Sequence, residues 1–266
     1  DINCFSMVPW DMTFTYYDEA SKSYKELKTT TNSKEYSDLW IPFLRSFAAH
    51  QKEKGWFDRT VIAMDERALD AMQDAYRIAQ EAAPGIKMSL AGNYHKELVD
   101  KIYDYCIAWK QQFTPEDLAL RNSKGWISTS YTACPDAMPN VGSNNEPIEA
   151  TYLPLYCIAN GFNGFLRWAW MNWTNNPMYD SRFKLFTPGD TYIVYPGNHS
   201  SRRFEHIIRG VQNVAKIETL RKEYKQKRNQ KALQLLEDAL SQFKNPTPNE
   251  AELRENIYKI ELLLNK

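Results

Sequence analysis

Short apolar segments alternate with segments of helical period over the first 200 residues, and this alternation restricts the fold more than any other feature of the sequence. The apolar segments are rich in β-branched and aromatic residues, which are typical of strands. The segments that we predict to be strands are 2–8, 60–64, 87–91, 104–109, 126–133 and 164–171, with a later one at 192–195. Strands that alternate with helices indicate repeated β-α units and a parallel sheet.

Helices are predicted between these strands and after them. Residues 36–52, 67–82 and 146–160 carry apolar side chains at helical spacing. From Ser201 onward the period is helical throughout, with a break at Asn245-Pro-Thr-Pro-Asn249. We therefore expect a C-terminal helical hairpin that follows the last strand.

The rhythm of strands and helices predicts an α/β fold of the (β/α)8 TIM-barrel type. The six early strands are two fewer than a closed barrel of eight requires, so we expect the first strands of the barrel to precede residue 1. Residues 1–200 are then the partial barrel that carries catalysis. Residues 201–266 are C-terminal helices that pack on it.

Charge and motif content exclude several classes of function. The 33 basic and 33 acidic side chains give zero formal net charge, so no global field gathers nucleic acid. The most apolar stretch, 152–171, contains Asn160, Asn163 and Arg167, and we predict no membrane span. The sequence lacks the glycine-rich nucleotide motifs, and its histidines and cysteines lack metal-ligand spacing. We predict neither a cofactor nor a metal.

Two adjacent carboxylates, Asp65 and Glu66, follow the strand 60–64 directly. The active site of a β/α barrel lies at the carboxyl ends of its strands, so both acids are placed where catalysis occurs. The competing interpretation is that Asp65 caps the next helix and Glu66 lies in its first turn, where the helix dipole favours acids. Hydrolysis that uses carboxylates is the chemistry that these residues best support.

A second informative region runs from residue 161 to residue 197 and mixes aromatic rings with planar polar groups. The candidate sugar-binding residues in it are Arg167, Trp170, Asn172, Trp173 and Asp180. Rings can stack on the C–H face of a sugar while amides and acids bind its hydroxyls.

Other interpretations of this region stay open. The tryptophans are also suited to the barrel core, and Asp180 is also suited to an ion pair with Arg182 that braces the loop. Tyr131 ends another predicted strand, so its hydroxyl either points into the same cleft or packs against its neighbours.

Several motifs together resemble glycoside hydrolase family 123, over roughly residues 1–222. They are Met-Asp-Glu at 64–66, Phe-Leu-Arg-Trp-Ala-Trp at 165–170, Asp-Ser-Arg-Phe at 180–183, Gly-Asp-Thr-Tyr-Ile-Val-Tyr-Pro-Gly at 189–197, and Ser-Ser-Arg-Arg-Phe-Glu at 200–205. The resemblance implies an exo-acting β-N-acetylgalactosaminidase whose substrate is a glycan or glycoconjugate. It also implies that an N-terminal domain of the same full-length protein is a partner, and that the location is periplasmic or extracellular.

The resemblance further implies substrate-assisted catalysis, with Glu66 as general acid/base and Asp65 orienting the 2-acetamido group. The acetamido oxygen attacks the anomeric carbon, an oxazolinium intermediate forms, and configuration is retained. By analogy with other acetamido-dependent enzymes, Tyr131 is the candidate to hold the acetamido oxygen. Trp173 is the candidate wall under the sugar, and Arg167 or Asp180 are candidates for hydroxyl contacts.

Two competing functions are also consistent with the sequence. One is a carbohydrate-binding domain without catalysis, and the other is a carboxylate glycosidase with a different sugar specificity. The intact Asp65-Glu66 pair favours an enzyme over the first alternative.

Overall fold

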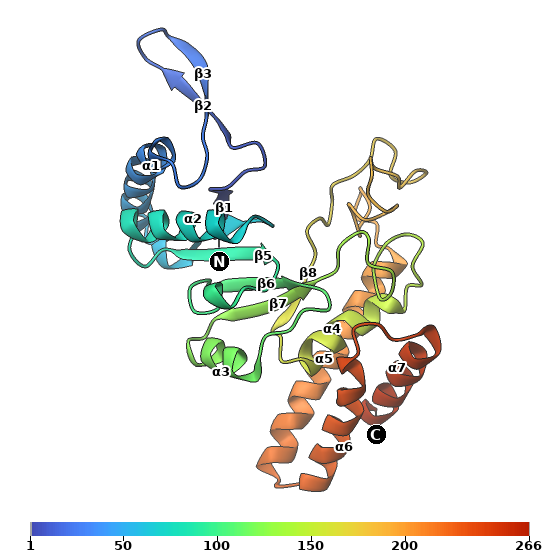
Figure 1. Cartoon of the computed structure of the whole chain (residues 1–266). Coiled ribbons are helices and arrows are strands. Elements are labelled where there is room, and N and C mark those ends of the chain that lie inside the picture. Colours follow the sequence, from blue (N-terminus) through green and yellow to red (C-terminus); the bar gives the residue numbers. More distant parts are fainter. Residues whose placement is uncertain (1, 266) are drawn as a thin grey trace. The chain divides into compact units, whose positions relative to one another are not determined.

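A computed structural model of the chain describes residues 2–265 and divides them into two compact units. The first unit comprises residues up to 107 together with 113–127, and the second comprises 108–112 and the residues from 128 onward. The described residues form an α/β fold with a mostly parallel six-stranded sheet, a separate two-stranded hairpin and seven α-helices (Figure 1).

The first unit contains four parallel strands in the order β1-β4-β5-β6. They are β1 (Ile2–Ser6), β4 (Thr60–Met64), β5 (Lys87–Gly92) and β6 (Asp104–Ala108). The inner strand β4 is almost wholly buried, as its continuous apolar sequence requires in a parallel sheet. Because the strands run in parallel, the loops after β1, β4 and β5 leave the same edge of the sheet.

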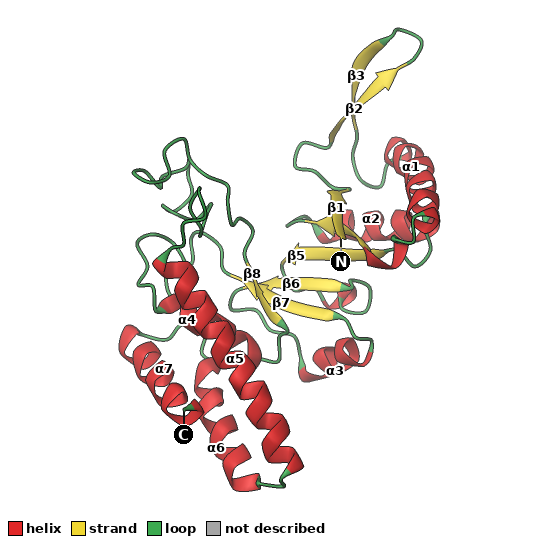
Figure 2. Cartoon of the chain, turned by 180° about the vertical axis from the view of Figure 1, so that it is seen from behind, coloured by secondary structure: helices red, strands yellow, loops and turns green. Residues whose placement is uncertain are grey.

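The helices of the first unit are α1 (Lys34–Glu53), α2 (Leu69–Ala82) and α3 (Pro115–Ser123), with short 3-10 turns η1 (Phe57–Arg59) and η2 (Lys96–Leu98). Ser33 caps α1 by accepting a hydrogen bond from the backbone of Tyr36. The α1 face that carries Trp40 and Leu44 is buried, and α1 packs along α2 (Figure 2). Thr114 and Asp117 form a reciprocal capping box at the start of α3.

A two-stranded antiparallel hairpin, β2 (Thr13–Asp18) and β3 (Ser23–Lys28), projects from the rest of the first unit (Figure 1). This hairpin was not predicted from the sequence. Tyr16, Tyr17 and Tyr24 are exposed, so neither strand has the buried alternating face by which a strand is recognised in sequence.

In the second unit, β7 (Ile127–Tyr131), which belongs to it from Ser128 onward, pairs in parallel with β8 (Gly164–Leu166). Its helices are α4 (Glu149–Ala159), α5 (Arg202–Gln226), α6 (Gln230–Ser241) and α7 (Glu250–Leu264), with the 3-10 turn η3 (Gln242–Lys244). These helices pack together (Figure 2). Helices α4 and α5 cross closely at Gly210, where an added Cβ would lie 2.7 Å from the Thr151 carbonyl oxygen.

The predicted strands at the centre of the sheet are confirmed within one or two residues, and the later ones are shorter or differ. The strand expected at 164–171 ends at Leu166, and residues 192–195 form turns with isolated bridges from Tyr192 to Met171 and from Tyr195 to His199. The α/β class with a parallel sheet is confirmed, whereas a closed eight-stranded barrel is not. The two units divide the chain at other points than 200/201, and a division at 200/201 stays a prediction.

Among residues 2–265, the longest helices carry too many charged side chains and too few apolar ones to cross a bilayer.

Candidate active site

The two acids Asp65 and Glu66 lie in the loop between β4 and α2, outside the helix. Helix α2 begins at Leu69, and its N-cap is Ala68, whose side chain has no polar atom. The interpretation of Asp65 as a helix cap and of Glu66 as a first-turn residue is therefore wrong. Both carboxylates instead stand at the carboxyl end of a buried strand, with Asp65 partly buried and Glu66 exposed.

Both oxygens of the Asp65 carboxylate accept hydrogen bonds, one from its own loop and one from the loop after β1. Oδ1 accepts from the backbone N–H of Glu66 at 2.8 Å, and Oδ2 accepts from the indole Nε1–H of Trp10 at 3.1 Å. The Arg67 guanidinium lies 3.8 Å from Oδ2. The carboxylate is thus held as an acceptor in a fixed orientation.

Arg67 joins the loop after β1 to the loop after β4. Its Nε donates to the Val8 carbonyl at 2.9 Å, one of its terminal nitrogens donates to the Glu66 carbonyl at 2.7 Å, and its side chain is 10% exposed. The guanidinium lies over the ring of Trp10, 3.4 Å from the ring centroid. This is a cation–π contact of the planar kind that arginine favours.

Trp10 and Arg67 were not predicted from the sequence. Trp10 follows the end of β1, and its approach to Asp65 depends on β1 pairing directly with β4. The available signal was an aromatic residue just beyond a predicted strand end, which gains meaning only once the strand order is known.

Glu66 lies beside the end of the next strand, β5. A Cβ added at Gly92 would lie 3.5 Å from the Cα of Glu66 and 3.7 Å from its Cγ. These distances are ordinary van der Waals contacts, so the end of β5 lies against Glu66. Across the described residues, no three His, Cys, Asp or Glu side chains gather in a manner that could hold a metal ion.

In the second unit, Arg167 is paired inside the protein. Its side chain has no exposed surface; it forms an ion pair with the buried Asp190 and donates to the Thr132 carbonyl at 3.1 Å. The other carboxylate oxygen of Asp190 accepts from the indole of Trp168 at 2.8 Å. These contacts make Arg167 a brace for the loop that follows β8.

A second buried arginine, Arg203, holds the same loop from the start of α5. It donates to the carbonyls of Val141 at 2.6 Å, Gly189 at 2.7 Å and Tyr192 at 3.0 Å. Gly189 has a φ of +76°, and an added Cβ would lie 2.9 Å from the Arg203 guanidinium. Several residues of the motifs that carried the family resemblance therefore shape this loop.

Trp173 and Asp180 line one surface hollow of about 290 Å³, together with Asn176 and Arg182. The indole N–H of Trp173 donates to the Val194 carbonyl at 2.9 Å, and its ring stays 40% exposed. Arg182 binds both oxygens of Asp180, at 2.8 and 2.7 Å, and this hydrogen bonding lowers the pKa of Asp180 to about 2. The hollow thus offers an aromatic ring beside a carboxylate that is already paired.

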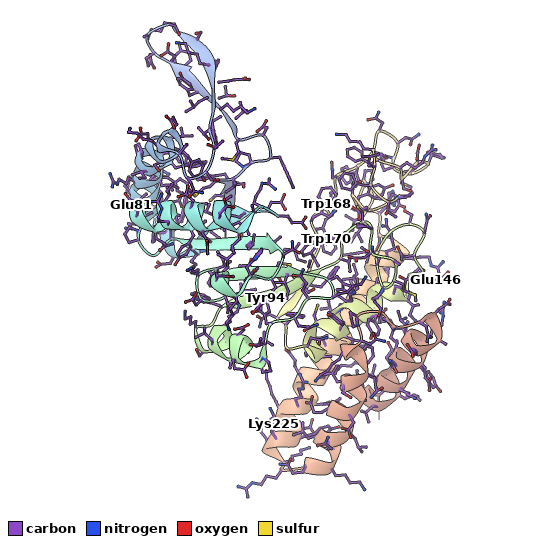
Figure 3. The ribbon with its side chains drawn as sticks, in the orientation of Figure 1. Glu81, Tyr94, Glu146, Trp168, Trp170 and Lys225 are labelled. Carbon is purple, nitrogen blue, oxygen red and sulfur yellow. The ribbon has the colours of Figure 1, made fainter. Side chains whose placement is uncertain are left out.

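The remaining predicted residues also lie in the second unit. Trp170, labelled in Figure 3 with Trp168, packs edge-on against Phe204 at a centroid distance of 6.0 Å. Asn172 is exposed, and its backbone N–H donates to the Thr191 carbonyl. Tyr131 ends β7 and is 9% exposed.

The predicted site residues are therefore distributed over both units. Asp65 and Glu66 belong to the first unit, and the six sugar-binding candidates belong to the second. Within the second unit, Trp173 and Asp180 line one hollow, whereas Arg167 is enclosed beneath the loop.

Comparison with known proteins identifies a family and solved structures with a similar fold. Residues 1–220 match the family model for the catalytic domain of glycoside hydrolase 123. The fold is similar to that of a family 123 glycoside hydrolase from Clostridium perfringens, whose structure was analysed for the details of glycolipid glycan hydrolysis. The TM-score is 0.85 and the identity 26%, over 99% of this chain and 50% of the Clostridium chain. A search of curated proteins gave no significant match.

Proposed function

Because the chain belongs to the glycoside hydrolase 123 family, we propose that it removes terminal β-linked N-acetylhexosamine, with N-acetylgalactosamine as the preferred sugar. The family is that of glycoside hydrolases, and the activity of this chain, the sugar, the mechanism and the residue roles are the content of the proposal. The observation that carries it is the placement of Asp65 and Glu66 at the end of β4, with both oxygens of Asp65 held by N–H donors.

In the proposed mechanism Glu66 protonates the glycosidic oxygen while the acetamido oxygen of the substrate attacks the anomeric carbon. The Asp65 carboxylate accepts a hydrogen bond from the acetamide N–H and orients the acetamido group for attack. The bond to the aglycone breaks and an oxazolinium ion forms. Glu66, now a carboxylate, takes a proton from water, and the water oxygen attacks the anomeric carbon, so that two inversions give net retention.

In the second unit, the exposed ring of Trp173 and the neighbouring Asp180 support a role in sugar binding. We retain Tyr131, Trp170 and Asn172 as candidates for further substrate contacts. The enclosed Arg167 supports the loop that presents these side chains, and we assign it no hydroxyl contact.

The Clostridium chain is about twice as long as the region that this chain matches. As the family resemblance implies, we propose that an N-terminal part of the same protein is a partner of this chain. A glycan or glycoconjugate is the proposed substrate.

The decisive experiment makes two single variants of the full-length protein, Glu66→Gln and Asp65→Asn. Hydrolysis of an aryl N-acetyl-β-galactosaminide is measured for each. Loss of one general acid is expected to lower kcat by about 10²- to 10⁴-fold. Asp65→Asn should lower hydrolysis strongly for substrates with the 2-acetamido group.

The matched control is Glu81→Gln, which changes an exposed glutamate of α2 in the same unit (Figure 3). It should retain wild-type activity. Unchanged turnover in Glu66→Gln would exclude the proposed mechanism. Sugar binding without any hydrolysis by the wild-type protein would favour a carbohydrate-binding function instead.

A further inference from the structure

We propose that Trp10 is a positioning residue for Asp65 and that Arg67 holds Trp10 in place. The inference rests on the proposed function, because it assigns Trp10 an effect on the residue that orients the acetamido group. The tryptophan lies on the loop after β1, and the acid lies on the loop after β4.

Trp10 is exposed and yet ordered. Its side chain is 75% exposed, although large aromatic rings are normally buried when their role is to stabilise the fold. Two directed contacts nevertheless fix it, the stack on Arg67 at 3.4 Å and the hydrogen bond to Asp65 at 3.1 Å. Little of the ring area is removed from water, so its contribution to folding is small.

Arg67 is anchored on two loops. Hydrogen bonds to the carbonyls of Val8 and Glu66 fix the guanidinium on both loops. Tyr36 donates to the Met7 carbonyl at 2.9 Å, which fixes the same β1 loop from α1. The ring of Trp10 therefore rests on a guanidinium that the backbone itself holds.

Two hydrogen-bond donors fix the direction of the Asp65 carboxylate. With one donor a carboxylate can rotate about its last torsion angle, whereas donors at both oxygens define its plane. The Glu66 amide supplies the donor at Oδ1 and Trp10 supplies the donor at Oδ2. Misplacement of a catalytic group by about 1 Å can cost about 10²-fold in rate, so this orientation matters for turnover.

The test is Trp10→Phe in the full-length protein, because phenylalanine keeps an aromatic ring over Arg67 and removes the N–H. The loss of one hydrogen bond predicts a fall in kcat/KM of about threefold to tenfold towards an aryl N-acetyl-β-galactosaminide. The fall should lie mainly in kcat. The matched control, Trp56→Phe, alters another exposed tryptophan of the same unit and should stay within about 1.5-fold of wild type.

A double-mutant cycle with Asp65→Ala separates positioning from a structural effect. If Trp10 acts through Asp65, Trp10→Phe should cause no further loss once the carboxylate is absent. Where activity is too low, the same cycle is measured as the affinity for an N-acetylgalactosamine thiazoline, a stable mimic of the oxazolinium ion. Thermal unfolding of Trp10→Phe should match that of Trp56→Phe.

The outcomes distinguish the two proposals. If Asp65→Ala lowers activity and Trp10→Phe behaves like Trp56→Phe, or if its loss persists undiminished in the Asp65→Ala background, the inference about Trp10 is wrong and the proposed function stands. If Asp65→Ala retains wild-type activity and thiazoline affinity, the proposed function fails, and the inference fails with it.

Discussion

Replacing Asp190 by Asn removes the charge that faces the buried guanidinium of Arg167. The exposed fraction is 0% for the Arg167 side chain and 2% for the Asp190 side chain, so solvent cannot replace the lost partner. Breaking a buried ion pair from one side costs about 3–5 kcal/mol. Arg167 keeps its hydrogen bonds to the Thr132 carbonyl and to the backbone carbonyl of Asp190, which places the expected loss near 3 kcal/mol.

The measurement is equilibrium urea denaturation followed by tryptophan fluorescence. With an m-value of about 2 kcal/mol/M, a loss of this size lowers the midpoint by about 1.5 M. The matched control is Asp180→Asn in the same loop, whose ion pair with Arg182 is solvent-exposed and should contribute little. Equal midpoints for Asp190→Asn and Asp180→Asn would refute the argument that burial decides the strength of these two pairs.

Two further predictions concern the crossing of α4 and α5. Gly210→Ala places a Cβ 2.7 Å from the Thr151 carbonyl, and the overpacking should exceed the gain in helix propensity and lower the free energy of unfolding by about 1–2 kcal/mol. Increased stability in the same urea assay would contradict this. Burial, with a smaller contribution from nearby arginines, lowers the pKa of His206, whose ring nitrogen lies 2.9 Å from the Thr151 hydroxyl. The imidazole of His206 therefore binds a proton more readily in the unfolded state than in the folded state. Its contribution to the free energy of unfolding is present above pH about 6.5 and is lost as the pH falls further. His206→Gln should make the free energy of unfolding depend less on pH between pH 7.5 and 5.

The central strands could be predicted from sequence because burial on both faces leaves a continuous apolar run. The strand β4 was predicted to the residue for this reason, and the position of Asp65 and Glu66 at its end followed from it. The hairpin at 13–28 could not be predicted in the same way, because its tyrosines are exposed and its strands have no buried face.

The loop after β8 shows a different limit of sequence patterns. Tyr192 and Ile193 resemble a strand in composition and are fully buried, but they are buried among loops and joined to Met171 by a single bridge. Burial rather than pairing in a sheet explains their apolar character. Likewise, the sequence around Arg167 could not reveal a partner 23 residues further along the chain.

The candidate site was predictable where one segment suffices and not where two segments meet. Asp65 and Glu66 follow from one strand and the loop after it. The contact between Trp10 and Asp65 joins residues 55 positions apart and requires the order β1-β4, which local periodicity does not contain.

The loop between β8 and α5 takes its shape from two arginines that lie at its borders, Arg167 just after the strand and Arg203 just inside the helix. Both arginines donate hydrogen bonds to oxygens of this loop, Arg167 to Asp190 and Arg203 to the Gly189 carbonyl. Grafting residues 168–201 alone onto another scaffold would leave those oxygens without their donors. A transplant that aims to keep the loop conformation must carry both arginines and the strand and helix ends that aim them.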